Sequence, residues 1–203
     1  SRGDAVRQSL ELRPPALQRR PIIFDVVNKR KLEVEETLFG NPWSCDRPRW
    51  SRDSSRFTLL YNQRGHQVIR LIAIDVKTGG ARAIIEETSP TFIDYSGKLD
   101  IHHLDETNEI LWASERDGWN HLYLFDALTG RMKNQVTRGA WVVRGVDRVD
   151  EAKRAVEFRA SGLFPNQDPY HIHHCRISLD KQDLVHLTDG DGTHEVNWSP
   201  DRT

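Results

Sequence analysis

The sequence is poor in the features that mark several large classes of protein. Its 203 residues contain two cysteines, one methionine and no apolar run long enough to cross a bilayer as a helix. A disulfide-stapled scaffold and a membrane-spanning helix are therefore both excluded within these residues. Cys45 and Cys175 lie outside any Cys-x-x-Cys motif, so we expect free thiols that are buried or half-buried.

An excess of charge of either sign is also missing. The chain has 29 basic and 30 acidic residues, which gives a formal net charge of -1. Proteins that bind nucleic acid or anionic membrane surfaces usually carry a strong positive field. We therefore expect no nucleic acid and no membrane as a partner.

The first 20 residues lack the apolar core of a signal peptide and contain five arginines. We expect residues 1–20 to be a connector or ragged edge, and the chain to be an excised or processed piece of a longer protein. The compartment stays open, and a periplasmic or secreted parent protein is compatible with the sequence.

The most informative stretch is Ser114–Gly130, which reads as a turn, a strand and a second turn. Residues 114–118 are polar and end in Asp-Gly, a strong signal for a tight turn. Residues 119–125 carry bulky side chains on both alternating faces, so the predicted strand is buried on both sides. Residues 126–130 turn the chain again.

Hairpin patterns like this one recur along the chain at residues 22–35, 71–85, 122–136 and 174–187. Their turns begin at Asp25, Asp75, Asp126 and Ser178, which are separated by 50, 51 and 52 residues. A second marker repeats as well, because Trp-Ser-x-Asp occurs at 50–53 and again 148 residues later at 198–201.

A period of about 50 residues without helices is typical of the blades of a β-propeller. We predict an all-β fold, a partial propeller of roughly three to four blades with four antiparallel strands each. An antiparallel sandwich with coincidental spacing is the alternative. The predicted blade units within residues 21–203 are about 22–36, 50–88, 99–138, 145–189 and 198–203.

Two linked motifs carry a family resemblance. Residues 114–123, SERDGWNHLY, are followed by residues 137–143, TRGAWVV. Together they resemble the N-terminal propeller of the dipeptidyl peptidase IV group of prolyl-oligopeptidase-type serine peptidases, and the resemblance extends from about residue 22 to the end of the chain. It implies that the chain is an arc of an eight-bladed ring.

The resemblance also implies an α/β-hydrolase domain, with a Ser-Asp-His triad, in the same parent chain. The parent would be a proline-preferring dipeptidyl or tripeptidyl exopeptidase that acts on peptide substrates, and a homodimer of it is left open. These residues contain no Gly-x-Ser-x-Gly nucleophile motif, so we expect no catalytic residue here and no hydrolysis by this chain alone. A stand-alone propeller that binds other proteins is the alternative.

Tyr95 is the candidate substrate-binding residue. Some members of the family place an aromatic side chain from this region against the substrate, and an ungapped count back from Gly118 reaches Tyr95. The alternative is packing between blades. The acidic pairs 35–36 and 86–87 lack the sequence context of the family's amine-binding glutamates, and we predict that they are solvated strand ends.

Three further groups have a functional and a structural interpretation. The charged triplet 115–117 could face a channel or hold its own turn. We favour the turn, with Arg116 bonded to neighbouring carbonyls or carboxylates. His171, His173 and Cys175 share one strand face, but the spacing of about 7 Å disfavours a shared metal ion, so we expect no metal and no cofactor. Residues 160–170 are predicted to form a long rim loop.

Overall fold

The computed structural model describes residues 20–199, and its regular structure consists of β-strands alone. The predicted connector at 1–20 lies almost entirely outside the described residues, as does most of the predicted unit at 198–203. In the described part of the chain, no helix has the length and hydropathy of a membrane span. The chain divides into two compact units, one that ends at Pro90 and one that begins at Thr91.

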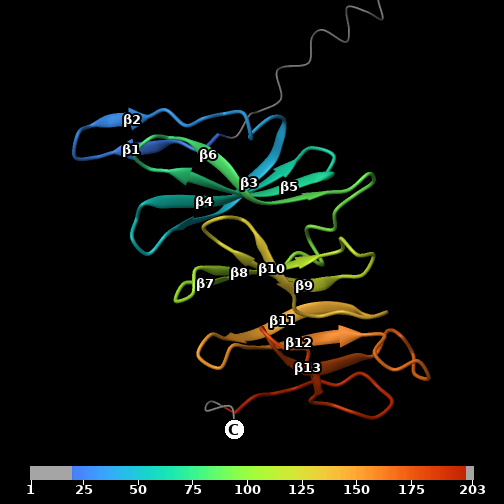
Figure 1. Cartoon of the computed structure of the whole chain (residues 1–203). Coiled ribbons are helices and arrows are strands. Elements are labelled where there is room, and N and C mark those ends of the chain that lie inside the picture. The colour runs from blue at the N-terminus through green and yellow to red at the C-terminus, as the bar shows by residue number, and fades with distance from the viewer. Residues whose placement is uncertain (1–19, 200–203) are drawn as a thin grey trace, which may run out of the picture. The chain divides into compact units, whose positions relative to one another are not determined.

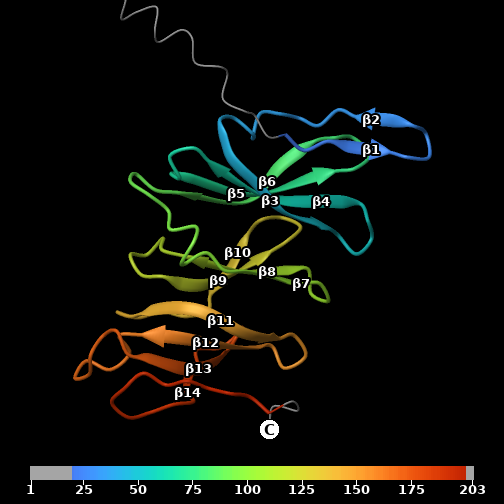
Figure 2. The same ribbon diagram turned by 180° about the vertical axis from the view of Figure 1, so that it is seen from behind.

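The first unit contains a hairpin and one sheet (Figures 1 and 2). The hairpin pairs β1 with β2, and the sheet has the order β3-β4-β5-β6. The bounds are β1 Ile23–Asp25, β2 Arg30–Leu32, β3 Pro42–Trp50, β4 Arg56–Gln63, β5 Val68–Asp75 and β6 Ala81–Thr88.

The second unit contains two four-stranded sheets that stack on one another (Figure 1). Their orders are β7-β8-β9-β10 and β11-β12-β13-β14, and β14 is labelled in Figure 2. The bounds are β7 Ile101–Leu104, β8 Glu109–Ser114, β9 His121–Asp126, β10 Met132–Gln135, β11 Val142–Asp150, β12 Ala155–Ser161, β13 Ile172–Ser178 and β14 Val185–His186.

All three four-stranded sheets are antiparallel meanders in which each strand pairs with the next one in the chain. This confirms the all-β prediction, and such meanders are the blades from which a propeller is built. The sheets span 42–88, 101–135 and 142–186, whereas the predicted units begin at 50, 99 and 145. The largest difference arises because β3 precedes the Trp-Ser-x-Asp turn and pairs across it with β4.

The sheets of the second unit share one hydrophobic core. The first sheet contributes side chains that include Leu111, Leu122 and Leu124, and the second contributes Phe158 and Cys175, all of them fully buried. The first unit has its own cluster around Tyr61 and Ile72. Each sheet therefore needs a neighbouring layer to cover its apolar face, as expected for stacked blades.

The strand predicted at residues 119–125 is present as β9, and it is buried on both faces as expected. It begins at His121 rather than Trp119, and the Trp119 side chain is 43% exposed. The reason is that the Asp117 carboxylate accepts the backbone N–H of Trp119 at 3.1 Å, which extends the turn by two residues.

An aspartate begins the turn of each of the hairpins β1–β2, β5–β6 and β9–β10. The carboxylates of Asp25, Asp75 and Asp126 each accept the backbone N–H groups of the residues two and three positions later. Hydrogen bonding to the charged form lowers the pKa of all three carboxyl groups. The regular spacing found in the sequence is therefore the spacing of these turns.

Gly79 lets the β5–β6 turn approach the segment that follows β2. Its φ is +76°, and a Cβ at this position would collide with the backbone carbonyl of Glu33. Its own carbonyl accepts the N–H of Glu35 at 2.9 Å. Only glycine satisfies both the backbone conformation and the close approach.

A charged cluster joins the two sheets of the second unit. Glu109 on β8 is 2% exposed, and its carboxylate receives Arg154 Nη1 at 2.8 Å and also the ammonium group of Lys133. Arg154, which precedes β12, donates through Nε to Asp180 at 2.6 Å. Burial alone would raise the pKa of the Glu109 carboxyl, but these hydrogen bonds and those of Thr107 lower it overall.

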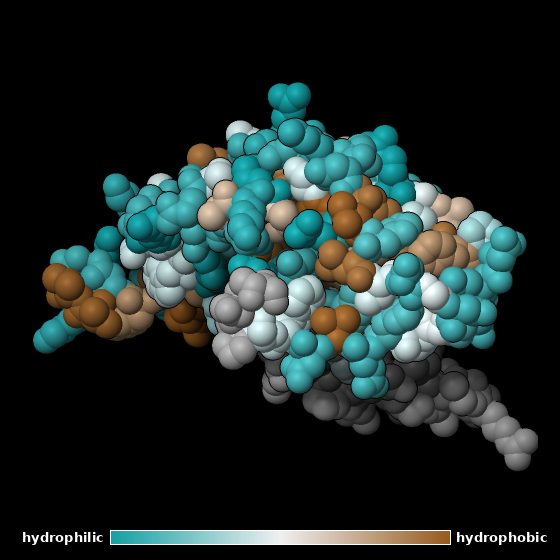
Figure 3. All heavy atoms as spheres, turned by 90° about the horizontal axis from the view of Figure 1, so that it is seen from below, coloured by the Kyte–Doolittle hydropathy of each residue, from teal (hydrophilic) through white to brown (hydrophobic). Residues whose placement is uncertain are grey.

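Both cysteines are free thiols, as predicted, with Cys45 half-buried and Cys175 buried. Burial raises the pKa of the Cys175 thiol to about 12, so this side chain acts as a small apolar group in the core. The molecular surface is mainly hydrophilic on the face shown in Figure 3, where hydrophobic side chains occur in small groups.

Candidate functional site

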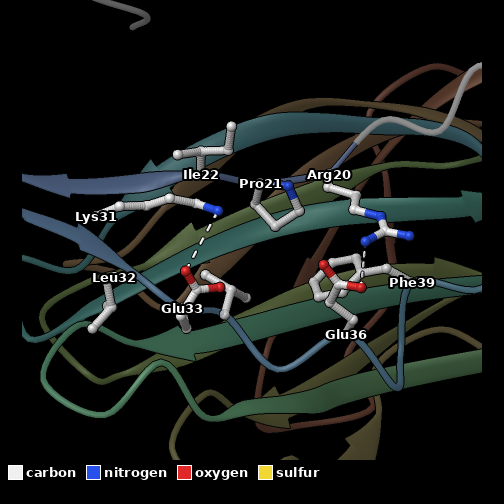
Figure 4. Close-up of a pocket in the computed structure, with 9 residues that line it drawn as sticks. Arg20, Pro21, Ile22, Lys31, Leu32, Glu33, Glu36 and Phe39 are labelled. Atoms are coloured by element: carbon white, nitrogen blue, oxygen red, sulfur yellow. Dashed lines mark hydrogen bonds and ion pairs between the residues drawn. The ribbon is translucent and has the colours of Figure 1, made fainter.

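The first unit contains a small pocket beside its β1–β2 hairpin (Figure 4). Its volume is about 160 Å³, and its lining is part apolar and part charged. The lining residues are Arg20, Pro21, Ile22, Lys31, Leu32, Glu33, Val34, Glu36 and Phe39.

The charges of this pocket are paired with one another. Arg20 Nη1 lies 2.5 Å from Glu36 Oε2, and Lys31 Nζ lies 3.6 Å from Glu33 Oε1 (Figure 4). All four side chains are more than 45% exposed, so each pair is well solvated. The lining contains no Ser, Cys or His, and its carboxylates and its cations are held in these exposed ion pairs.

The acidic pairs singled out in the sequence belong to this unit and contact other parts of it. The Glu35 carboxylate accepts the hydroxyl of Thr37 at 3.0 Å, and Glu36 pairs with Arg20. Glu86 on β6 pairs with Arg70 on β5. The side chains of Glu36 and Glu86 are exposed, as predicted, and the second pair lies near the end of β6. The first pair was predicted to end a strand but lies beyond β2, which stops at Leu32.

Tyr95 lies in the loop that leads into the sheet of β7–β10. Asp94 shapes this loop, since its Oδ1 accepts the N–H of Gly97 at 2.9 Å and the hydroxyl of Ser96 at 3.2 Å. The Tyr95 ring lies 6.1 Å from the ring of Phe92, which is 52% exposed. An aromatic pair therefore stands at the surface of a loop with a defined conformation.

This loop is fastened to the turn of the stretch at 114–120. Lys98 Nζ lies 2.6 Å from Glu115 Oε1. Asn120, which is 2% exposed, donates through Nδ2 to the carbonyl of Val143 at 2.8 Å and to that of Lys98 at 3.4 Å. The position of Tyr95 is therefore set by the same turn that begins β9.

Arg116 contacts other residues of the turn and of β9. Its Nε donates to the Ser114 hydroxyl at 2.9 Å. Its guanidinium lies over the rings of Tyr123 and Phe125, at 4.7 and 5.1 Å from their centroids. We predicted carbonyl or carboxylate partners, and the two rings of β9 are additional cation–π partners that the sequence pattern did not indicate.

The two halves of the sequence motif meet at His121. Its Nδ1 lies 3.1 Å from the Thr137 hydroxyl, and its Nε2 lies 3.0 Å from the carbonyl of Gly139. Its ring packs edge-on against Trp141, with the ring centroids 4.8 Å apart. Burial lowers the pKa of His121 despite the opposing effects of the Gly139 carbonyl and Asp117, so the neutral ring is favoured.

Comparison with known proteins identifies the same family that the motif at residues 114–123 and 137–143 resembles. The model of the dipeptidyl peptidase IV N-terminal region matches residues 22–203. The chain belongs to this family.

Two solved structures share the fold of this dipeptidyl peptidase IV N-terminal region. Porphyromonas gingivalis dipeptidyl peptidase 4 matches with a TM-score of 0.68 and 18% identity, over 85% of this chain and 23% of that one. A putative dipeptidyl aminopeptidase IV from Bacteroides ovatus matches with a TM-score of 0.58 and 18% identity, over 79% of this chain and 24% of that one. The chain therefore spans about a quarter of these proteins, and its fold is that of a partial β-propeller.

In this N-terminal region the residues that resembled metal ligands do not converge. His173 and Cys175 are buried, whereas His174 turns to Asp147, with Nδ1 3.0 Å from Oδ2. Among the residues that the structure describes, no three His, Cys, Asp or Glu side chains are placed to hold a metal ion. Of the rim loop predicted at 160–170, residues 162–170 lie between β12 and β13, whereas residues 160 and 161 are the end of β12.

Proposed function

We propose that this chain is the non-catalytic propeller portion of a dipeptidyl-peptidase-IV-like serine peptidase, where it gates access and positions peptide substrates. The observation that carries the proposal is the family match over residues 22–203 together with the absence of a Gly-x-Ser-x-Gly motif. An α/β-hydrolase domain in the same parent chain would supply the triad. The substrates would be peptides from which the parent removes short N-terminal units, preferentially after proline.

A ring of blades can select substrates by size, because an extended peptide passes through an opening that excludes a folded protein. The full-length protein should therefore cleave a short Xaa-Pro peptide but not the same N-terminal sequence on a stably folded protein. Unfolding that protein should restore cleavage. Equal cleavage of the folded and unfolded forms would contradict the gating role.

Tyr95 is the proposed positioning residue. Its loop has a defined conformation set by Asp94 and is fastened to Glu115 and Asn120, so little ordering entropy would be lost on binding a peptide. In the full-length protein, Tyr95→Ala should raise KM for an Xaa-Pro peptide about three- to tenfold and change kcat less than about twofold. Tyr95→Phe should keep KM close to that of the unchanged protein.

Tyr170→Ala is the matched control, because Tyr170 is 82% exposed and lies in a different loop. It should leave both constants unchanged. An unchanged KM for Tyr95→Ala would overturn the positioning role of Tyr95 and leave the gating role standing. A full-length protein with no peptidase activity would instead favour the alternative of a protein-binding propeller.

A further inference from the structure

Four histidines gather at one end of the sheet β11–β14. His173 on β13 is 1% exposed, and its ring centroid lies 5.2 Å from that of His194. The ring of Phe164 bridges the group, because its centroid lies 4.7 Å from that of His173 and 5.0 Å from that of His186. We call His171, His173, His186 and His194 the histidine cluster.

The histidine cluster lies where one segment, residues 187–194, is attached to β13. The N–H of Leu187 donates to the carbonyl of His174 at 2.8 Å, and the N–H of His194 donates to the carbonyl of Ile172 at 3.0 Å. The hydroxyl of Thr188 accepts the N–H of His174 at 2.9 Å. The segment is also held by the N–H of Ile172, which donates to the Thr193 hydroxyl at 3.4 Å, and by Gln167 Nε2, which donates to the carbonyl of Gly190 at 3.0 Å.

The packing suits neutral rings. In the described part of the chain, Nδ1 of His173 and Nε2 of His194 are buried and have no hydrogen-bond partner. A proton added to either atom would create a positive charge without an acceptor, which is costly in a buried site. Burial lowers the pKa of His173, and the neighbouring charges of His194, His171 and His186 lower it further, against the opposing effect of a hydrogen bond with the backbone of Thr188.

The elements that pack around His173 supply little negative charge. Opposite it on β12 lies Ala160, and the loop before β13 contributes Phe164. β14 contributes His186, and the covering segment contributes His194. Among the described residues, Asp191 is the carboxylate within ion-pair distance of a member of the cluster: its Oδ1 lies 3.2 Å from Nδ1 of His171, without forming a hydrogen bond, and its side chain is 72% exposed.

We propose that the histidine cluster is a pH-sensitive latch, which holds residues 187–194 against β13 at neutral pH and releases them below about pH 6. As the pH falls, protonation within the histidine cluster places several like charges in one packed group. The resulting repulsion opposes the few bonds that attach the segment.

Hydrogen exchange in the full-length protein tests the latch directly. Protection factors are measured at pH 7.5 and pH 5.5, each corrected for the intrinsic exchange rate. The amides of Leu187 and His194 should lose at least about tenfold in protection at the lower pH, because their opening is linked to proton uptake. The amide of Val136, which bonds the carbonyl of Leu122 in the neighbouring sheet, should keep its protection.

His194→Phe keeps a ring in the cluster but removes a titrating group, and it should largely abolish the pH effect. His186→Gln, at an exposed position, is a second variant that should reduce the effect at least about threefold. His66→Asn is the matched control, since His66 lies outside the cluster at a φ of 55° that asparagine tolerates. It should leave the pH effect intact.

Three results would overturn the latch. Protection of Leu187 and His194 could be equal at both pH values. The pH effect could survive unchanged in both His194→Phe and His186→Gln. Protection of Val136 could fall as much as that of His194, which would show that the loss is global rather than local.

Discussion

His121 shows how a single side chain explains a sequence motif. Residues 114–123 and 137–143 are separated in the sequence, yet His121 bonds Thr137 and Gly139 and packs on Trp141. The histidine is therefore the physical link between the two halves. Its role is structural, because both ring nitrogens already have partners and the ring is fully buried.

His121 makes a prediction about pH. Its pKa is lowered in the folded state, so between that pKa and the ordinary value near 6.5 the unfolded chain binds more protons than the folded one. The free energy of unfolding should therefore fall as the pH drops below about 6.5. Urea unfolding of the full-length protein at pH 7.5 and 5.5 measures this effect.

The matched variant His121→Asn removes the titrating group at this site. It should be less stable than the unchanged protein at pH 7.5 by about 2 kcal/mol, because packing against Trp141 is lost. Its stability should also depend less on pH over this range. A pH dependence that is the same with and without His121 would assign the effect to other groups.

At the scale of an element, the hairpin turns depend on two kinds of interaction. An aspartate carboxylate begins the turn of β1–β2, β5–β6 and β9–β10. In addition, the backbone of the β5–β6 turn closely approaches and bonds the segment after β2. This second interaction depends on Gly79. The turn chemistry is visible in the sequence, whereas the approach to Glu33 is visible only in the structure.

Replacement of this glycine should be costly. Gly79→Ala should destabilise the protein by about 2 kcal/mol or more, because the alanine must adopt a positive φ and its Cβ meets the Glu33 carbonyl. Gly65→Ala is the control, since Gly65 also has a positive φ of 94° but a Cβ there would meet no other part of the protein within 4 Å. Thermal unfolding compares the two. An equal loss in both variants would mean that the contact with Glu33 contributes nothing.

The sheets were more predictable than their charged contacts. The repeat of turns predicted four-stranded meanders, because turn residues and alternating strands are local signals. The strand starts at Pro42 and His121 were missed, since β3 is interrupted by bulges and the Asp117 turn extends over Trp119. The contacts of Arg116 with the Ser114 hydroxyl and the rings of β9 were not predicted, because a strand pattern specifies a face but not the neighbour that the face meets.

The contact between Glu109 and Arg154 belongs to the scale of the whole molecule, because it joins two sheets of the second unit. Arg154→Ala should destabilise the protein by about 2 kcal/mol, because the Glu109 carboxylate, which is 2% exposed, loses its main partner. Lys133 still offsets part of the charge of Glu109. Chemical unfolding measures the loss.

Lys31→Ala removes an exposed pair with Glu33 and is the control for this change. It should cost less than about 0.5 kcal/mol, since both side chains are solvated. Equal losses in the two variants would show that burial of Glu109 does not make its pairing with Arg154 important.

The candidate site was predictable only as far as the family resemblance reached. Tyr95 is a candidate through the resemblance alone, and the structure adds the loop that holds it and its neighbour Phe92. The histidine cluster was not predicted as a group, because His186 and His194 come from segments that follow β13 and have no spacing rule in common with His173. Contacts between such segments are decided by the fold.

The most direct test of the account compares the full-length protein with the 203-residue chain on a fluorogenic Xaa-Pro substrate. We expect the full-length protein to release the fluorophore and a serine-directed inhibitor to stop this release, while the 203-residue chain shows no turnover. Inhibitor-sensitive turnover by the 203-residue chain alone, or none by the full-length protein, would contradict the assignment of this chain as the non-catalytic portion of a serine peptidase.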